Sequence, residues 1–181
     1  MACDLTAGRT EPCKDAVGGL KNVYFTNYDE IDGNGYTYDV TDTDMIATVT
    51  GAATINAYKY ELKGANVLEQ TVNSNRDNGT TFVEQSLTVV LKKQDVATHK
   101  EIKLLSYGRP RVVVEDYNGN YFLMGLEHGV ELTTAAISSG TAMADLSGYT
   151  LTLVGMEKIP ANFIDASSEA DLATVGFTVV A

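Results

Sequence analysis

The sequence is poor in the residues that most often carry catalysis and metal binding. Tryptophan is absent, and the 181 residues include only two histidines and two cysteines. Cys3 and Cys13 are ten positions apart and form no Cys-x-x-Cys pair. The histidines, His99 and His128, are far from both, so the ligand spacing of a zinc site is missing. We expect two reduced thiols in a short loop, with a disulfide that closes this loop as the alternative.

The short motifs of common enzyme classes are also missing. The chain contains no Gly-x-Ser-x-Gly nucleophile motif and neither of the phosphate-binding patterns GxxxxGK[ST] and GxGxxG. No cysteine–histidine pairing is indicated, and we expect His99 on the polar side of a helix and His128 in a turn or strand. A carboxylate pair for glycoside hydrolysis stays open, although tryptophan platforms for a sugar are absent. The sequence therefore predicts no catalytic residue, no cofactor and no enzymatic activity.

Two acidic clusters are the only candidates for a cation site. The first cluster holds Asp29, Glu30, Asp32 and Asn34. Tyr36 and Val40 occupy positions where a calcium-binding loop needs oxygen ligands, so we expect a solvated turn there. In the second cluster, Asp42 and Asp44 follow Asp39 and share one face if the segment is extended. That cluster either binds Ca²⁺ weakly or discourages unwanted strand pairing, and we predict no resident metal.

Positive charge is scarce as well. The chain has 13 Lys and Arg against 24 Asp and Glu, a formal net charge of −11. Because a protein that grips nucleic acid needs clustered basic residues, the balance argues against that function. The acidic excess indicates either simple solubility or a surface that lets polyanions pass. No apolar run reaches the ~18 residues that cross a bilayer, and residues 1–19 lack the apolar core of a secretory signal, so we expect synthesis in a cytoplasm and no membrane partner.

Residues that favour strands and turns are abundant. Sixteen Gly stand against three Pro, and Tyr, Thr and Val are frequent. Alternating patterns predict strands at 20–28, 55–62, 111–116, 147–160 and 175–180, and a hairpin of strands 67–73 and 80–91 around a tip at 73–79. A change from a two-residue to a helical period predicts one substantial helix at 94–105. A Gly- and Ser-rich composition predicts a loop at 134–145, and a short polar segment follows at 165–171. We expect a mostly β fold, two packed antiparallel sheets with one flanking helix, in a single domain (20–181) preceded by an arm (1–19).

The carboxyl-terminal half carries a recognisable pattern. From Arg111 to Pro160 it reads RVVVEDYNGNYFLMGLEHGVELTTAAISSGTAMADLSGYTLTLVGMEKIP. An Asn-Gly turn is followed by a hydrophobic-Gly-x-x-x-Gly segment (124–129) and by Gly-Tyr-x-Leu-x-hydrophobic-x-Gly-x-Glu (148–157). This segment resembles the end of bacteriophage tail tube proteins or related tail-neck ring proteins, and the opening GGLKNVYFTNYDEI is similar to how such proteins begin. The residues after Pro160 do not match that pattern.

The resemblance implies a structural virion protein. In such families the subunits form hexameric rings, their inner sheets join into one β-barrel around a channel, the rings stack, and DNA leaves through the bore. The expected location is therefore the virion tail, after assembly in the host bacterial cytoplasm. The expected partners are copies of the chain itself, other tail or neck proteins, and genomic DNA as a transiting polyanion that the wall repels.

If the chain is a tail tube subunit, specific residues have expected roles. We expect the lumen to be acidic, with one strand face bearing Glu61 and Glu69 and another bearing Glu84. The hairpin tip is the candidate for contacts between rings, as is the arm 1–19; the tip residues in question are Asn73, Asn75, Arg76, Asp77 and Asn78. Two alternatives remain, a capsid decoration or head–tail joining protein, and a non-viral Ig-like adhesin module, for which a secretory signal would be expected.

Overall fold

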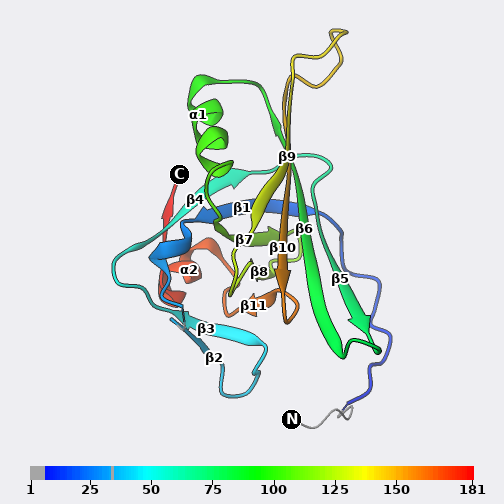
Figure 1. Cartoon of the computed structure of the whole chain (residues 1–181), viewed down its shortest axis with the longest axis vertical. Coiled ribbons are helices and arrows are strands. Elements are labelled where there is room, and N and C mark those ends of the chain that lie inside the picture. The colour runs from blue at the N-terminus through cyan, green and yellow to red at the C-terminus, as the bar shows by residue number, and fades with distance from the viewer. Residues whose placement is uncertain (1–6, 34) are drawn as a thin grey trace.

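The computed structural model describes residues 7–33 and 35–181, which form two β-sheets, two α-helices and one short 3₁₀ helix (Figure 1). The strands are β1 (Leu20–Thr26), β2 (Tyr36–Tyr38), β3 (Met45–Val49), β4 (Ile55–Glu61), β5 (Val67–Asn75), β6 (Thr80–Lys92), β7 (Arg111–Asp116), β8 (Tyr121–Met124), β9 (Glu131–Ser138), β10 (Gly148–Glu157), β11 (Asn162–Ile164) and β12 (Phe177–Val180). The helices are η1 (Tyr28–Glu30), α1 (Val96–Leu105) and α2 (Glu169–Val175). The predicted class, mostly β with two sheets and a flanking helix, is confirmed.

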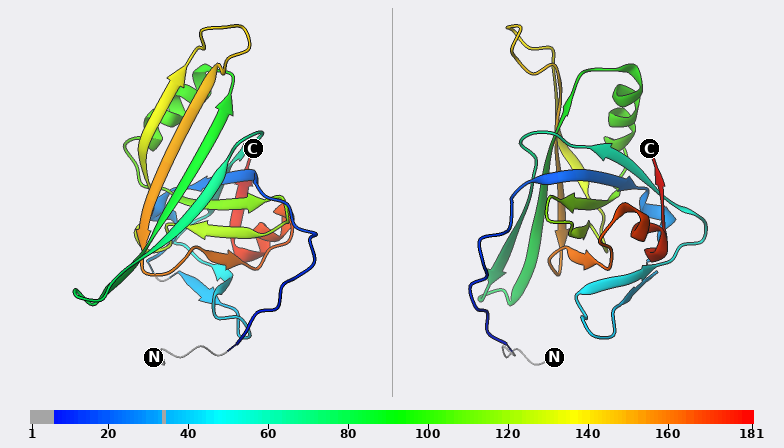
Figure 2. Two further views of the ribbon diagram at one scale, coloured as in Figure 1. Left: turned by 90° about the vertical axis from the view of Figure 1, so that its right-hand side faces the viewer. Right: turned by 180° about the vertical axis from the view of Figure 1, so that it is seen from behind.

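The larger sheet has eight strands in the order β12-β4-β1-β7-β8-β11-β3-β2. It curls into a half-barrel, and α2 lies in its hollow (Figure 2). Its pairs are antiparallel except β11–β3 and β12–β4, which run parallel. These two parallel pairs are the one departure from the expected antiparallel sheets. Both are made by strands that follow β10: β11 lies between β8 and β3, and β12 forms the edge beside β4.

The central strands of this sheet are buried on both faces. In β1, Val23 and Phe25 face the smaller sheet while Tyr24 faces the half-barrel interior. In β7, Val112 and Val113 divide between the same two cores. A strand with two buried faces has no solvent side for polar residues, which explains the uninterrupted apolar run of β7.

The smaller sheet has four strands in the order β5-β6-β10-β9, all antiparallel. Its inner face carries Leu87 and Val89 of β6 and Leu151 and Leu153 of β10, which are fully buried against the larger sheet. The alternation of β6 and β10 puts hydroxyl and carboxylate side chains on the opposite face. This second face is the candidate functional surface.

The predicted helix is confirmed, but it begins at Val96, two residues later than expected. The Asp95 side chain accepts a hydrogen bond from the Thr98 amide at 2.7 Å and caps α1. Hydrogen bonds from Thr98 hold the pKa of the Asp95 carboxyl below its ordinary value. An N-cap of this kind ends the preceding extended segment, so the helix begins at Val96.

Two expectations for the carboxyl-terminal region are wrong. The segment predicted as a loop, 134–145, is strand β9 up to Ser138, because its small Thr and Ala residues pair along β10. The polar segment 165–171 leads into α2, which extends to Val175. Gly176, with φ of 125°, ends this helix, so the last strand begins at Phe177 instead of Val175.

The described part of the amino-terminal arm, residues 7–19, is exposed and has no regular secondary structure. Val17 exchanges two hydrogen bonds with the Asn118 side chain, at 2.9 and 2.8 Å, and so attaches the end of the arm to the β7–β8 turn. Cys13 is exposed, whereas Cys3 lies outside the described residues. Within the described part of the chain, no helix combines the length and apolar character needed to span a membrane.

Candidate functional site: the open face and edges of the small sheet

The outer face of the four-stranded sheet is polar and open. Figure 2 (left) shows no described element in front of it. The pairing register assigns to this face Glu69, Thr71, Glu84, Ser86, Thr88, Glu131, Thr134, Thr150 and Thr152, among others. The only basic side chain in register with them is Lys92, at the end of β6 opposite Gly148. The same register puts the exposed apolar side chains of Val67, Phe82 and Met156 on this face. The face therefore combines hydroxyl and carboxylate groups with a few apolar side chains and has almost no positive charge.

Two of the predicted lumen residues lie together on this face. Glu69 pairs with Ser86, and Glu84 pairs with Thr71, so the two carboxylates occupy diagonal positions on β5 and β6. Diagonal neighbours in an antiparallel pair are about 7–8 Å apart, close enough to repel. Glu69 is exposed and Glu84 is half-buried, and neither is in an ion pair of the described residues.

The predicted grouping of the glutamates is wrong in one respect. Glu61 ends β4 and pairs with Asn22 of β1, so it belongs to the larger sheet. It therefore does not share a face with Glu69, which lies beside Glu84 instead. The error arose because sequence alternation gives the parity of one strand but not the sheet to which a strand belongs.

Both edges of the small sheet are long and unpaired in the described chain. β5 has nine residues and β9 has eight, and most of their side chains are exposed. Three large apolar residues lie on these edges with about half of their surface in solvent: Val67 (44%) and Val72 (60%) on β5, and Ile137 (48%) on β9. Neither edge contains proline or lysine, the usual protections against strand addition.

The two edges run in opposite directions. Each neighbouring pair in the sheet is antiparallel, so the first and the fourth strand, β5 and β9, are antiparallel to each other. When one copy of the sheet is placed beside another, β9 of the first therefore meets β5 of the second in antiparallel orientation. The alternation of strand direction continues across such a junction without a break.

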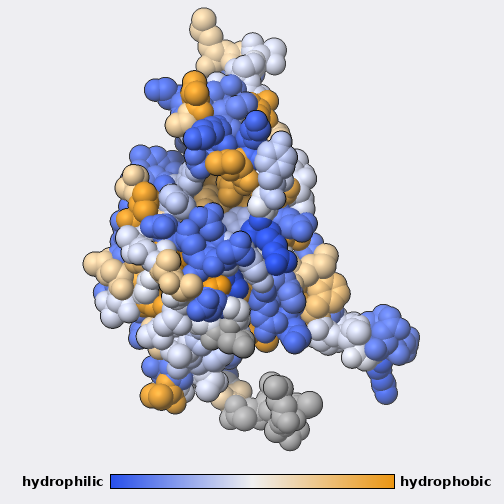
Figure 3. Space-filling view, turned by 60° about the vertical axis from the view of Figure 1, so that its left-hand side comes forward, coloured by the Kyte–Doolittle hydropathy of each residue, from blue (hydrophilic) through white to orange (hydrophobic). Residues whose placement is uncertain are grey.

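The predicted hairpin is confirmed and is longer than expected. β5 and β6 extend past the body, and their tip projects as a hydrophilic knob in the space-filling view (Figure 3). The Asn75 carboxamide accepts hydrogen bonds from the amides of Asp77 and Asn78, at 2.9 and 3.1 Å, and so builds the turn. Arg76, Asp77 and Asn78 are exposed at the tip, and Asn73 is half-buried on β5. Asn75 thus shapes the tip, while the other predicted contact residues keep their side chains free of turn hydrogen bonds.

Charge is separated along the long axis of the molecule. One end carries α1 and its flanks, where Lys and Arg outnumber acids; the basic residues there are Lys92, Lys93, Lys100, Lys103 and Arg109. The other end carries the β2–β3 connection (Figure 1). This connection, residues 39–44, holds Asp39, Asp42 and Asp44 and no Lys or Arg. The α1 segment and the β2–β3 connection are therefore complementary in charge.

In each of the two acidic clusters weighed as cation sites, one carboxylate is held by hydrogen bonds within the fold. Glu30 accepts hydrogen bonds from Asn27 and from the Asn56 amide, so its carboxylate is used to hold β4; Asn34 lies outside the described residues. Asp39 accepts the amides of Thr41 and Asp42, which lowers the pKa of its carboxyl. Asp42 and Asp44 line a cleft of about 560 Å³ beside β11.

One cluster escaped the sequence analysis. Glu127 and His128, in the turn between β8 and β9, lie beside Glu157 at the end of β10. His128 was expected in a turn or strand, and it lies in the turn. Both segments were singled out by their Gly-x-x-x-Gly and Gly-x-Glu spacing, but spacing does not reveal that they meet in the fold.

Comparison with known proteins returned no family model that matches the chain and no curated protein that matches its sequence. The small sheet must therefore be interpreted from its own chemistry. Its open face bears carboxylates, its two edges are unpaired and opposite in direction, and the α1 segment and the β2–β3 connection are complementary in charge. The unpaired edges leave backbone N–H and C=O groups to which a further strand can pair.

Proposed function

We propose that this protein is a structural virion subunit, a tail tube or tail-neck ring protein of a bacteriophage, which assembles into stacked rings around a DNA-conducting channel. The observation that carries the proposal is the small sheet, whose carboxylate-bearing open face lies between two unpaired edges of opposite direction. The resemblance of residues 111–160 to tail tube proteins supplies the ring and its hexameric size. How the rings close, line the channel and stack is inferred from the edges and open face of the small sheet and from the ends of the molecule.

Ring closure follows from the two edges. Pairing of β9 with β5 of the next copy is head-to-tail, and a head-to-tail contact closes into a ring when the rotation allows it. Six copies with four strands each make a barrel of about 24 strands, wider than the 16–18-stranded barrels that already hold an aqueous channel. Closure also removes the exposed edges that would otherwise promote aggregation.

The open face then becomes the wall of the channel. Its opposite face is committed to the core between the sheets, so only the Thr-, Ser- and Glu-bearing side is free to line a bore. Carboxylates at Glu69 and Glu84 repel phosphate, and the near absence of Lys and Arg leaves no site to retain it. DNA therefore passes as a mobile polyanion and is not bound.

Stacking of the rings uses the ends of the molecule. The basic end around α1 of one ring meets the acidic end around the β2–β3 connection of the next, and this attraction sets a head-to-tail order. The projecting hairpin, with Arg76 and Asp77 at its tip, reaches across the junction. At the two ends of the tube the same surfaces meet other tail or neck proteins, in a particle assembled in the host bacterial cytoplasm.

The experiment compares edge variants in light scattering at micromolar concentration. Val72→Lys on β5 and Ile137→Lys on β9 each place an ammonium where a neighbouring strand must pack. Loss of partial burial of one aliphatic side chain costs about 1 kcal/mol per interface, so the association midpoint should rise at least about fivefold. Val180→Lys, on the exposed edge strand β12 of the other sheet, is the matched control and should assemble like the parent.

The outcomes separate the candidate functions. If Val180→Lys prevents association while the β5 and β9 variants assemble normally, the ring is built on other edges and the proposed arrangement is wrong. A parent protein that is monomeric at every concentration favours the binding-module alternative, an Ig-like adhesin. A closed trimer favours a capsid decoration protein.

A further inference from the structure

Glu157 is a buried carboxylate that has no ion-pair partner. It is the last residue of β10, and 3% of its surface is exposed. One of its carboxylate oxygens accepts hydrogen bonds from the backbone amides of Glu127 and His128, at 3.1 and 2.8 Å. Among the described residues, no Lys, Arg or His nitrogen lies within 4.0 Å of its carboxylate. A buried carboxylate in this situation either takes up a proton or recruits a cation.

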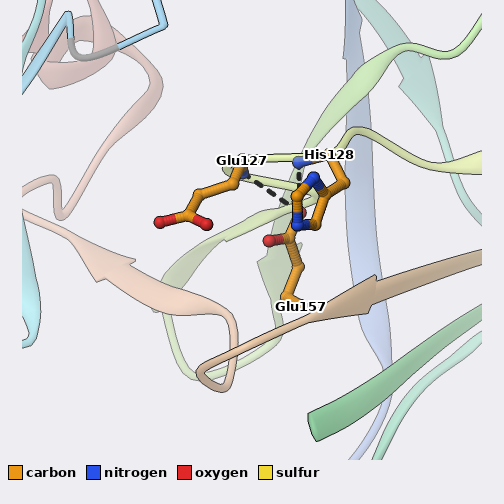
Figure 4. Close-up of side chains that lie close together, drawn as sticks. All are labelled: Glu127, His128 and Glu157. Carbon is orange, nitrogen blue, oxygen red and sulfur yellow. Dashed lines mark hydrogen bonds between the residues drawn. The ribbon is translucent and has the colours of Figure 1, made fainter.

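The turn that covers Glu157 brings two further side chains with possible metal-ligand atoms, those of Glu127 and His128, close to its carboxylate. Gly125 and Gly129 both have φ of 72°, and the Gly129 amide donates to the Gly125 carbonyl at 3.1 Å, which closes a tight turn. An added Cβ at Gly125 would lie 2.7 Å from the Gly129 backbone, so the turn requires glycine there. In Figure 4 the His128 imidazole lies over the Glu157 carboxylate, and Glu127 comes from the same turn.

These three side chains have the composition and spacing of a metal site. One ligand atom from each of Glu127, His128 and Glu157 can be chosen so that all lie within 4.8 Å of one another. No other such group of three His, Cys, Asp or Glu residues occurs in residues 7–33 and 35–181. A zinc ion takes ligand atoms at about 2.0–2.2 Å, so its neighbouring ligands lie at most about 4 Å apart. To bind an ion at those distances, the exposed His128 and half-buried Glu127 side chains would rotate toward Glu157.

We propose that Glu127, His128 and Glu157 bind a divalent first-row transition metal ion, with Zn²⁺ as the best-matched ion. One imidazole nitrogen and two carboxylate oxygens are ligands that zinc accepts, and they leave a fourth position for water. The imidazole disfavours Ca²⁺ and Mg²⁺, which prefer all-oxygen sites. Bound metal would connect the β8–β9 turn to the end of β10, and so connect the larger sheet to the smaller one.

The charges around the cluster fit this assignment. Arg111, a buried cation, directs its hydrogen bonds to the backbone carbonyls of Leu126, Tyr28 and Ile31. Its charge attracts that of Glu157, but among the described residues the two side chains form no ion pair. Lys158 lies 4.0 Å from Glu127 but is exposed, so a metal ion displaces it at little cost.

The test is calorimetric titration of the full chain with Zn²⁺ in a Cys3→Ser/Cys13→Ser background, which removes the thiols as competing ligands. We expect one ion per chain and a rise in Tm of about 5–10 °C at a free concentration 100-fold above Kd. His128→Ala should abolish both effects. His99→Ala, a change at the only other histidine, should leave both unchanged.

Glu157→Gln provides the second variant. It keeps a carbonyl oxygen for the two turn amides but removes the anionic ligand, so Zn²⁺ affinity should fall at least tenfold while the protein stays folded. The proposal is overturned if the parent shows no saturable Zn²⁺ binding, or if His128→Ala binds as tightly as the parent. Equal losses in His99→Ala and His128→Ala would also overturn it, because they would locate the ion elsewhere.

Discussion

Reversing the charge of the open sheet face should convert a repelling wall into a binding one. Glu69→Lys with Glu84→Lys adds four charges per chain and changes the formal net charge from −11 to −7. Each new ammonium attracts a nearby phosphate by about 1–4 kcal/mol, depending on how much solvent lies between them. Because both residues lie on the same face at diagonal positions, all the added charge is directed at the same surface.

The assay is fluorescence anisotropy of a short labelled duplex mixed with the protein before assembly. Parent rings should not retain the DNA at 50 mM salt, whereas rings of the double variant should. If two lysines per bound segment contact phosphates, affinity should fall about tenfold between 50 and 200 mM salt, because each contact releases a counterion. The size of the assemblies should be unchanged, since neither substitution is on the residues that form the core.

The control is Glu61→Lys with Glu101→Lys, which makes the same charge change on β4 and α1. Both residues are exposed and lie away from the open face. This variant should retain no more DNA than the parent. If it binds DNA as tightly as the Glu69/Glu84 variant, net charge alone explains the effect, and the assignment of the open face to the channel wall is refuted.

Two further predictions concern the hairpin and the pH dependence. Replacement of residues 74–81 by Asn-Gly should leave Tm and ring formation unchanged but shorten tubes in micrographs; tubes of parent length would remove the hairpin from ring stacking. Burial alone would raise the pKa of Glu115, but hydrogen bonds from Lys21, Asn22 and Tyr24 together hold it below its usual value of 4.5. The stability that Glu115 contributes is therefore present at neutral pH and is lost as pH falls below about 4.5. Tm measured from pH 6 to 3 should fall less in Glu115→Gln than in the parent, and parallel curves would contradict this.

Local chemistry made part of the fold predictable. The change to a helical period predicted α1 to within two residues of its start, and the polar tip between two alternating strands predicted the hairpin. Residues 134–138 of β9 were predicted as loop because Ala135 and Ala136 have low strand preference and Ser- and Gly-rich residues follow; this segment is ordered by its pairing with β10. α2 was missed because its apolar residues, Leu172 and Val175, contact the half-barrel interior, which no local pattern reveals.

The candidate surfaces were predictable to a smaller extent. The residues that bear charge could be read directly, but their grouping depends on register between strands. Glu69 and Glu84 share a face only because Thr71 pairs with Glu84. In the same way, His128 and Glu157 are 29 positions apart and meet only because one turn wraps the end of β10. Such long-range placements follow from the packing of the two sheets and not from any spacing.

The most direct test of the central claim is the assembly state of the full chain. Light scattering at micromolar concentration, with negative-stain images of the same sample, measures mass and shape together. The account predicts rings of about six times the 19.4 kDa chain mass, stacked into tubes at higher concentration. Particles of 19.4 kDa without rings, at all concentrations and also in kosmotropic salt, would contradict it.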